Sequence, residues 1–194
     1  MKPAPSNSFR FDGKLQVRGR LGNDPLSETR PSLGSNEKGL ERITMTIDYG
    51  RLPKDGFAKL VSELLVEDLG ESLYFWREVL GFEIAYQRPE QKFAYLERPE
   101  GAQIMLCERS GGIWETAPME KPYGRGVMFQ IRISSIDPII GRLKDLRVPI
   151  YGGPREVWRR YGDREGGKRE VIVLDPNGYL IMLAEDLGER PLLK

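Results

Sequence analysis

The chain has 194 residues, 39% of them hydrophobic, and its 30 Lys and Arg nearly balance 29 Asp and Glu. No run approaches the roughly 18 apolar residues of a membrane span, and the single cysteine, Cys107, excludes an intramolecular disulfide framework. The absence of histidine removes the commonest metal ligand and the usual general base. The N-terminus lacks the apolar core of a secretory signal, so a cytoplasmic protein is expected.

The charge is unevenly distributed. Residues 1–44 carry 8 Lys and Arg and 5 Asp and Glu (8 − 5 = +3), while residues 45–194 carry 22 and 24 (22 − 24 = −2). A net charge of −2 on residues 45–194 does not indicate a nucleic-acid-binding protein, which usually has an excess of Lys and Arg. Residues 1–44 are rich in Pro, Gly, Ser and Arg without a sustained period, which predicts a disordered or loosely ordered leader, followed by a lead-in segment at 45–60.

A first β-α-β-β-β module is predicted at 61–110. A strand at 61–66 is followed by a helix over about 69–80, which Asp68 and Glu71 begin and Gly81 ends. Strands follow at 82–86, 93–97 and 103–108.

After a linker at 111–126, a second module of the same kind is predicted at 127–186. Its first strand carries Phe129, Ile131 and Ile133 on one face. Asp137 and Pro138 suit the N-cap and first residue of its helix. About ten extra residues, around 155–168, are expected to form an Arg-rich loop, and 187–194 a short polar tail.

The two modules contain an internal repeat. The stretch 178–185 has the same Gly, Ile, Met, Leu and Glu, in the same order, as 101–108, an offset of 178 − 101 = 77. The first strands match at an offset of 67 (Val66 with Ile133), and the difference between the offsets measures the insertion. A repeat of a whole strand–turn–strand unit indicates a duplicated module.

Two consecutive β-α-β-β-β units resemble the vicinal-oxygen-chelate superfamily, which includes glyoxalase I, extradiol dioxygenases and the fosfomycin and bleomycin resistance proteins. The resemblance covers about 58–187 and rests on Glu63 to Leu69, on Phe75-Trp76 and on Leu80-Gly81-Phe82. The stretches 124–131 and 175–179 look most like the bleomycin resistance branch. The resemblance implies an α+β fold in which paired modules form a curved mixed sheet with the helices on the outside.

In the metalloenzymes of this superfamily, the first and last strands of each module supply His or Glu ligands to a metal in the groove of the sheet. The matching positions here are Val61, Met105, Met128 and Met182. None of these side chains suits a hard divalent ion, which prefers carboxylate or imidazole ligands. The resemblance therefore implies a fold whose best-known metal chemistry this chain does not support, and no cofactor is expected.

Strand alternation predicts which other side chains share the groove side. They are Glu63, Tyr95, Gln103, Met105, Gln130, Arg132 and Met182. Apolar and aromatic walls with a few polar groups are typical of a small-molecule pocket. The alternative is a groove filled by its own side chains, with Glu63 and Arg132 paired across the two halves.

Two tryptophans lie outside the regular strand patterns. Trp114 and Trp158 would stack on flat rings of a bound drug, or would only anchor their loops. The run from Trp158 to Tyr161 mixes aromatic and basic residues as a nucleic-acid site does. Acidic neighbours such as Asp163 dilute its charge, so a solvated loop or part of the groove rim is favoured.

These observations lead to a first hypothesis, a metal-free drug-binding protein of the bleomycin resistance type. It would sequester a small molecule, glycopeptide antibiotics being the family's example, and would act as a homodimer without nucleic-acid or membrane partners. Bleomycin itself is cationic and would favour an acidic cleft, which Arg132 and the Arg-rich insertion do not supply. The alternatives are a metal-independent lyase- or isomerase-like enzyme with Glu63 as acid or base, and a ligand-sensing or structural module.

Overall fold

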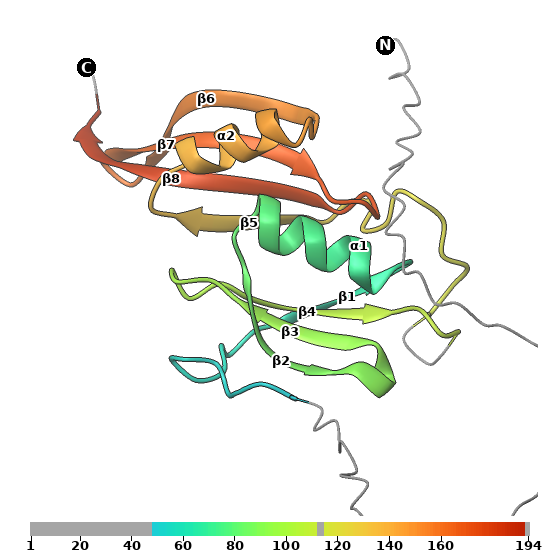
Figure 1. The fold of residues 1–194 in the computed structure, drawn as a ribbon. Helices are drawn as coiled ribbons and strands as arrows, with labels where there is room; N and C mark the ends of the chain where they lie inside the picture. Colours follow the sequence, from blue (N-terminus) through green and yellow to red (C-terminus); the bar gives the residue numbers. More distant parts are fainter. Residues whose placement is uncertain (1–47, 112–114, 193–194) are drawn as a thin grey trace, which may run out of the picture. The chain divides into compact units, whose positions relative to one another are not determined.

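The computed structural model describes residues 48–111 and 115–192 of the chain. The first module contains β1 (Ser62–Val66), α1 (Leu69–Tyr74) with its π-helical continuation η1 (Phe75–Val79), β2 (Glu83–Arg88), the 3-10 turn η2 (Pro89–Gln91), β3 (Phe93–Glu97) and β4 (Gln103–Glu108). The second contains β5 (Met128–Ile133), α2 (Asp137–Asp145), β6 (Ile150–Tyr161), β7 (Arg164–Leu174) and β8 (Leu180–Pro191) (Figure 1). The predicted leader at 1–44 lies outside the described residues.

Each module forms a four-stranded mixed sheet with the same connectivity. The strand orders are β1-β4-β3-β2 and β5-β8-β7-β6. The first strand pairs in parallel with the last in both modules, and the remaining pairs are antiparallel. The predicted α+β class and the paired β-α-β-β-β modules are confirmed.

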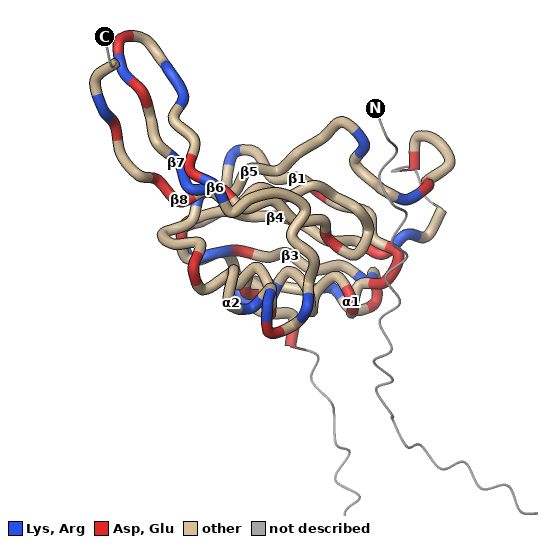
Figure 2. The backbone as a smooth tube through the Cα atoms, turned by 90° about the horizontal axis from the view of Figure 1, so that it is seen from above, with Lys and Arg blue, Asp and Glu red and all other residues tan. Residues whose placement is uncertain are grey.

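One hydrophobic core joins the two modules. Alternate residues of the strands, among them Leu64, Leu106, Ile131 and Leu183, meet the apolar side of both helices in a single cluster of buried side chains. Trp76 is fully buried at its centre. Both helices lie on the same side of the strands (Figure 2), so the other face of each sheet is turned away from the core.

The helices begin and end as their sequences predict, with one exception. The side chain of Asp68 accepts a hydrogen bond from the Glu71 amide at 2.7 Å, and Gly81 ends the helix with φ at +74°. In the second module, Asp137 is the first helical residue, so the prediction that it is the N-cap is wrong: Ile136 occupies that position and offers no capping side chain. Its amide instead donates to Glu185 at 3.0 Å.

The internal repeat explains why Glu185 binds the start of this helix. Glu108 and Glu185 are the last matching residues of the two copies. Glu108 accepts the amide of Leu69 at 3.2 Å, just as Glu185 accepts that of Ile136. The echoed glutamates therefore bind the amide groups at the start of their own module's helix, where helix backbones leave donors unpaired.

The ten-residue insertion is part of the sheet. Residues 155–161 continue β6 and residues 164–168 belong to β7, so the expected loop is a pair of strands. The expected tail is also replaced, because residues 187–191 continue β8 and pair with β7. The outer ends of these three strands, here called the ribbon, comprise 155–168 and 186–191 and project from the rest of the sheet (Figure 2). Charges of both signs follow one another along the ribbon.

In the part of the chain that the structure describes, no helix is both long enough and apolar enough to span a membrane.

Candidate ligand-binding groove

The sheet face opposite the helices is the predicted groove face. In the first module, Tyr95 is 2% exposed and packs with Ala85 and Phe93, and Val61, Met105 and Cys107 pack partly against this cluster. Strand alternation also places Glu63 on this face, because it pairs with Met105 in register. Burial raises the pKa of the Cys107 thiol, and the charge of Glu63 adds to this effect, which suits a packed thiol rather than a nucleophile.

The lead-in segment closes this half of the face. The ring of Phe57 meets that of Tyr95 edge-on at 5.5 Å. Gln103 accepts hydrogen bonds from the Tyr95 hydroxyl at 2.6 Å and the Ala58 amide at 2.7 Å, and it donates to the Gly56 carbonyl at 2.7 Å. Tyr95 and Gln103, both predicted to bind a ligand, thus already bind the chain itself. The lead-in therefore covers this half of the groove.

The lead-in is fixed to the module at two places. It adds a bridge to the edge of β2, where Gly50 pairs with Tyr86. Further along, the buried carboxylate of Glu97 pairs with Arg51 at 2.6 Å and accepts the amide of Lys54 at 2.9 Å. A Cβ atom on Gly50 would lie 2.3 Å from the carbonyl oxygen of Ala85, so only glycine fits this bridge.

The second module presents a more open face. Met128, Gln130 and Arg132 alternate along β5, and all three side chains are exposed, Met128 to 44%. Met182 of β8 pairs with Gln130 in register and is buried, with 6% exposed. Arg132 lies 3.9 Å from Asp186, so the pairing with Glu63 considered from the sequence is not formed.

The residues at the four family metal positions do not fit a divalent metal. Val61 has no donor atom, and Met105, Met128 and Met182 offer only thioether sulfur, a soft and weak ligand. Within the described ranges, no group of three or more Cys, Asp or Glu side chains could hold a metal ion. The chemistry of the donor set therefore supports no metal-dependent step.

A cavity of about 360 Å³ opens on the groove side of the ribbon. It is lined by charged residues, a tyrosine and three glycines, namely Arg132, Arg159, Tyr161, Gly166, Gly167, Lys168, Asp186, Gly188 and Glu189. Of the predicted site residues, only Arg132 belongs to it.

A fully buried carboxylate lies next to this cavity. Glu170 pairs with Arg159 through two contacts of 2.5 and 3.2 Å and with Arg155 at 3.6 Å. The hydrogen bonds from Arg159 hold the pKa of Glu170 below its usual value, although burial acts in the opposite direction. The sequence analysis missed Glu170, Arg159 and Lys168 as parts of a site. Glu170 and Lys168 could have been found from the alternation of Glu170, Lys168 and Gly166, which places these three residues on one face of β7.

The two predicted aromatic contacts take different places. Trp158 is on the opposite face of the ribbon from Arg159, where it stacks under the guanidinium of Arg190 at 3.9 Å. It therefore anchors the ribbon and does not line the cavity. Trp114 lies outside the described residues.

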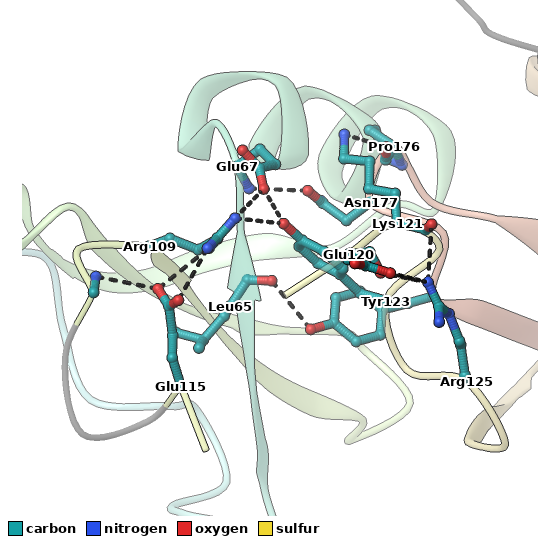
Figure 3. Close-up of polar contacts among 12 residues, drawn as sticks. Leu65, Glu67, Arg109, Glu115, Glu120, Lys121, Tyr123, Arg125, Pro176 and Asn177 are labelled. Atoms are coloured by element: carbon teal, nitrogen blue, oxygen red, sulfur yellow. Dashed lines mark hydrogen bonds and ion pairs between the residues drawn. The ribbon is translucent and has the colours of Figure 1, made fainter. Parts of the chain in front are cut away.

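A polar cluster near the end of β4 binds described residues of the linker (Figure 3). Arg109 binds Glu67 at 2.6 Å, the hydroxyl of Tyr123 at 2.9 Å and Glu115 at 2.9 Å. Tyr123 also donates to Glu67. The neighbouring carboxylates raise the pKa of Arg109, so the cluster keeps its charge and acts as a fixed ionic support.

One solved structure shares this architecture. TioX from Micromonospora sp. ML1 is 18% identical, with 68% of this chain and 100% of that chain covered and a TM-score of 0.51, and it shares the fold. A glyoxalase/bleomycin resistance protein/dioxygenase superfamily member from Vibrio splendidus 12B01 is 31% identical, with 64% of this chain and 95% of its own covered, at a TM-score of 0.27. Among curated proteins, none matches the chain.

The model of one protein family matches residues 57–183, from the end of the lead-in to the first residues of β8. This range is most of the described chain and agrees with the resemblance found in the sequence. The chain therefore belongs to the Glyoxalase/Bleomycin resistance protein/Dioxygenase superfamily.

Proposed function

We propose that this protein binds a small organic molecule on the groove face of the second module, without a metal, and acts by sequestration. The observation that carries the proposal is the lining of that face. Apolar side chains stand at the family metal positions, and one of them, Met128, is 44% exposed on the face of β5 that also carries Arg132, a residue of the cavity lining. Exposed apolar surface next to a few polar groups is what a ligand pocket offers.

The covered half of the groove supports a ligand position on the second module. Because Phe57, Gly56 and Ala58 cover Tyr95 and Gln103, the ligand would contact mainly β5 and β8. Bleomycin-type glycopeptides stay within the proposal as one candidate class, but the cations at Arg132, Arg159 and Lys168 favour other ligands over a cationic drug.

The homodimer expected from the resemblance is also kept as a proposal. Exposed apolar side chains of the lead-in support it, including Leu52 at 70% and Leu60 at 86%, because such residues commonly mark contact surfaces when they gather. Sedimentation velocity on the wild type and on Leu60→Asp tests this point. A monomeric wild type at all concentrations would end the dimer proposal and leave the binding proposal intact.

Fluorescence titration with the neutral dye N-phenyl-1-naphthylamine tests binding to the groove. Met128→Gln replaces an exposed apolar side chain by a polar one of similar size, and we expect it to weaken binding about fivefold, a loss of about 1 kcal/mol of apolar contact. Leu52→Gln is the matched control, since it makes the same type of change in the lead-in. Equal affinities for both variants and the wild type would contradict the proposed site.

A further inference from the structure

The ribbon cavity has the features of a site for an acidic group. We propose that it binds the carboxylate, sulfonate or phosphate of a small-molecule ligand that also carries a flat ring. This inference rests on the proposed function, because it assigns a charge to the ligand that the groove face takes up. It adds a site built by the inserted residues, apart from the family metal positions.

The floor of the cavity is backbone. Gly167 pairs with Gly188 in register. Next to this pair, Leu187 has no partner in β7, which makes a β-bulge. Gly188 has φ at +84°, and the space where its Cβ would lie is open. The backbone of these two glycines and of Gly166 lines the hollow of about 360 Å³.

One wall is aromatic. A Cβ atom on Gly166 would lie 2.7 Å from the Tyr161 ring, so this ring rests directly against the backbone of β7. Half of Tyr161 remains exposed, at 50%. A flat ligand can therefore reach the tyrosine ring, and such ring pairs are favourable beyond the area that they bury.

Cations outnumber anions on the face of the sheet that holds the cavity. Register and contacts place Arg132, Arg155, Arg159, Arg164 and Lys168 there, against Asp186, Glu170 and Glu189, which gives 5 − 3 = +2. Two of the anions are closely paired: Glu170 with Arg159, and Glu189 with Arg164 at 2.8 Å. Among the described residues, Lys168 forms no ion pair within 4.0 Å, and the contact of Arg132 to Asp186 is long at 3.9 Å.

The buried Glu170 prepares the site for an anion. Its bidentate contact with Arg159 fixes the guanidinium plane at the cavity wall. An arginine has five N–H donors, and this contact uses two of its nitrogen atoms on one side only. Fixed donors cost less entropy when they bind a ligand than mobile ones do, so Arg159, Arg132 and Lys168 form a partly preorganised anion-binding set.

The test compares two dyes that differ by one acidic group. 8-Anilinonaphthalene-1-sulfonate carries a sulfonate that N-phenyl-1-naphthylamine lacks, and both report binding by fluorescence on the full chain. We expect the sulfonate dye to bind about tenfold more tightly, the factor that corresponds to about 1.4 kcal/mol. Lys168→Gln should weaken the sulfonate dye about three- to tenfold and leave the neutral dye unchanged, whereas Arg132→Gln, a change on the groove face itself, should weaken the sulfonate dye more than the neutral dye.

Arg160→Gln is the matched control, because it removes the same charge from the same ribbon. Arg160 alternates with Arg159 along β6 and binds the Gly162 carbonyl at 3.1 Å, so its side chain lies on the other face. Urea midpoints of all three variants should equal that of the wild type, which shows that the ribbon stays folded.

The outcomes separate this inference from the proposed function. Equal affinities for the two dyes, or equal losses in Lys168→Gln and Arg160→Gln, would overturn the anion site. If the neutral dye still binds and is weakened by Met128→Gln, the groove proposal survives that result. If only the sulfonate dye binds, and Lys168→Gln weakens it, the anion site stands and the groove proposal fails.

Discussion

Asn177 accepts the backbone amide of Glu67 at 2.9 Å, across 110 positions of sequence. The contact has a counterpart with the modules exchanged, in which Glu100 accepts the amide of Ser134 at 3.1 Å. The two pairs are related by the offsets of the repeat, since 177 − 100 = 77 and 134 − 67 = 67. Each module thus uses the turn before its last strand to bind the chain just after the first strand of the other.

The first prediction concerns this contact. Asn177 is 1% exposed and also donates to the buried hydroxyl of Ser72 at 3.0 Å. Asn177→Ala should lower the free energy of unfolding by about 2–4 kcal/mol, because it leaves buried polar partners without a hydrogen bond. Urea denaturation measures this loss. Ser134→Ala is the control at the exposed counterpart. It removes only the hydroxyl bond to Glu100 at 2.7 Å, leaves the amide bond in place and should cost about 1 kcal/mol or less, so equal losses at the two positions would contradict the argument.

The contact between Glu100 and Ser134 makes the free energy of unfolding depend on pH. Burial alone would raise the pKa of Glu100, but hydrogen bonds from Arg98 and Ser134 outweigh it and lower this pKa from 4.5 to about 2. A carboxylate whose pKa is lower in the folded state stabilises the fold above its unfolded pKa, and the contribution is lost as pH falls. Between pH 5 and pH 2, Glu100→Gln should therefore lose less stability than the wild type. Parallel curves of unfolding free energy against pH for the two proteins would refute this assignment.

A third prediction concerns the lead-in. Gly50→Ala places a Cβ against the Ala85 carbonyl at a φ of +88°, so the bridge to β2 should open. The amide of Gln87, which donates to the Tyr49 carbonyl at 2.8 Å, would then exchange its hydrogen about tenfold faster, as a local destabilisation of about 1.4 kcal/mol requires. Hydrogen exchange followed by nuclear magnetic resonance measures this rate. Gly56→Ala has a similar φ of +77° with open space around its Cβ, and an equal change in the Gln87 rate there would show that strain alone is responsible.

The fourth prediction follows from the donor set at the metal positions. Dye binding and the thermal midpoint should be unchanged when EDTA is added or when Mg²⁺, Mn²⁺ or Ni²⁺ is supplied, because a valine and three methionines offer no hard ligand. Met182→Glu with Val61→Glu is the informative comparison, since it returns carboxylates to two of the four positions. A metal-dependent rise in the midpoint of the wild type would overturn the metal-free proposal.

The sequence predicts those parts of the fold that have a buried face. Strands 93–97 and 103–108 were predicted with the bounds found in the structure, because all five residues of the first are buried and Ile104 and Leu106 of the second alternate with half-buried residues. The helix of the first module was predicted for the same reason. The repeat offset of 77 correctly related two glutamates that both bind helix amides.

The ribbon could not be predicted in this way, because neither of its faces is apolar. Its strands are held by cross-strand pairs such as Arg159 with Glu170 and Arg190 with Glu165, and such pairing leaves no hydrophobic period in the sequence. The docking of the lead-in on the first module was missed for a related reason, since Gln103 and Glu97 fix it through single contacts to its backbone. These contacts lie more than 40 positions apart in sequence. Only the folded chain brings them together.

The ribbon gives β6, β7 and β8 two different kinds of support along their length. Near Val171 and Ile181 the strands lie on the shared core, whereas the outer ends rely on ladder hydrogen bonds and on partly exposed ion pairs such as Arg164 with Glu189. Salt screens exposed pairs, over a Debye length of about 8 Å at physiological ionic strength. Local opening should therefore begin at the tip of the ribbon and become rarer toward the core. Higher ionic strength would make the assembled cavity rarer. An acidic ligand bound to its cations would hold the ends of these strands together.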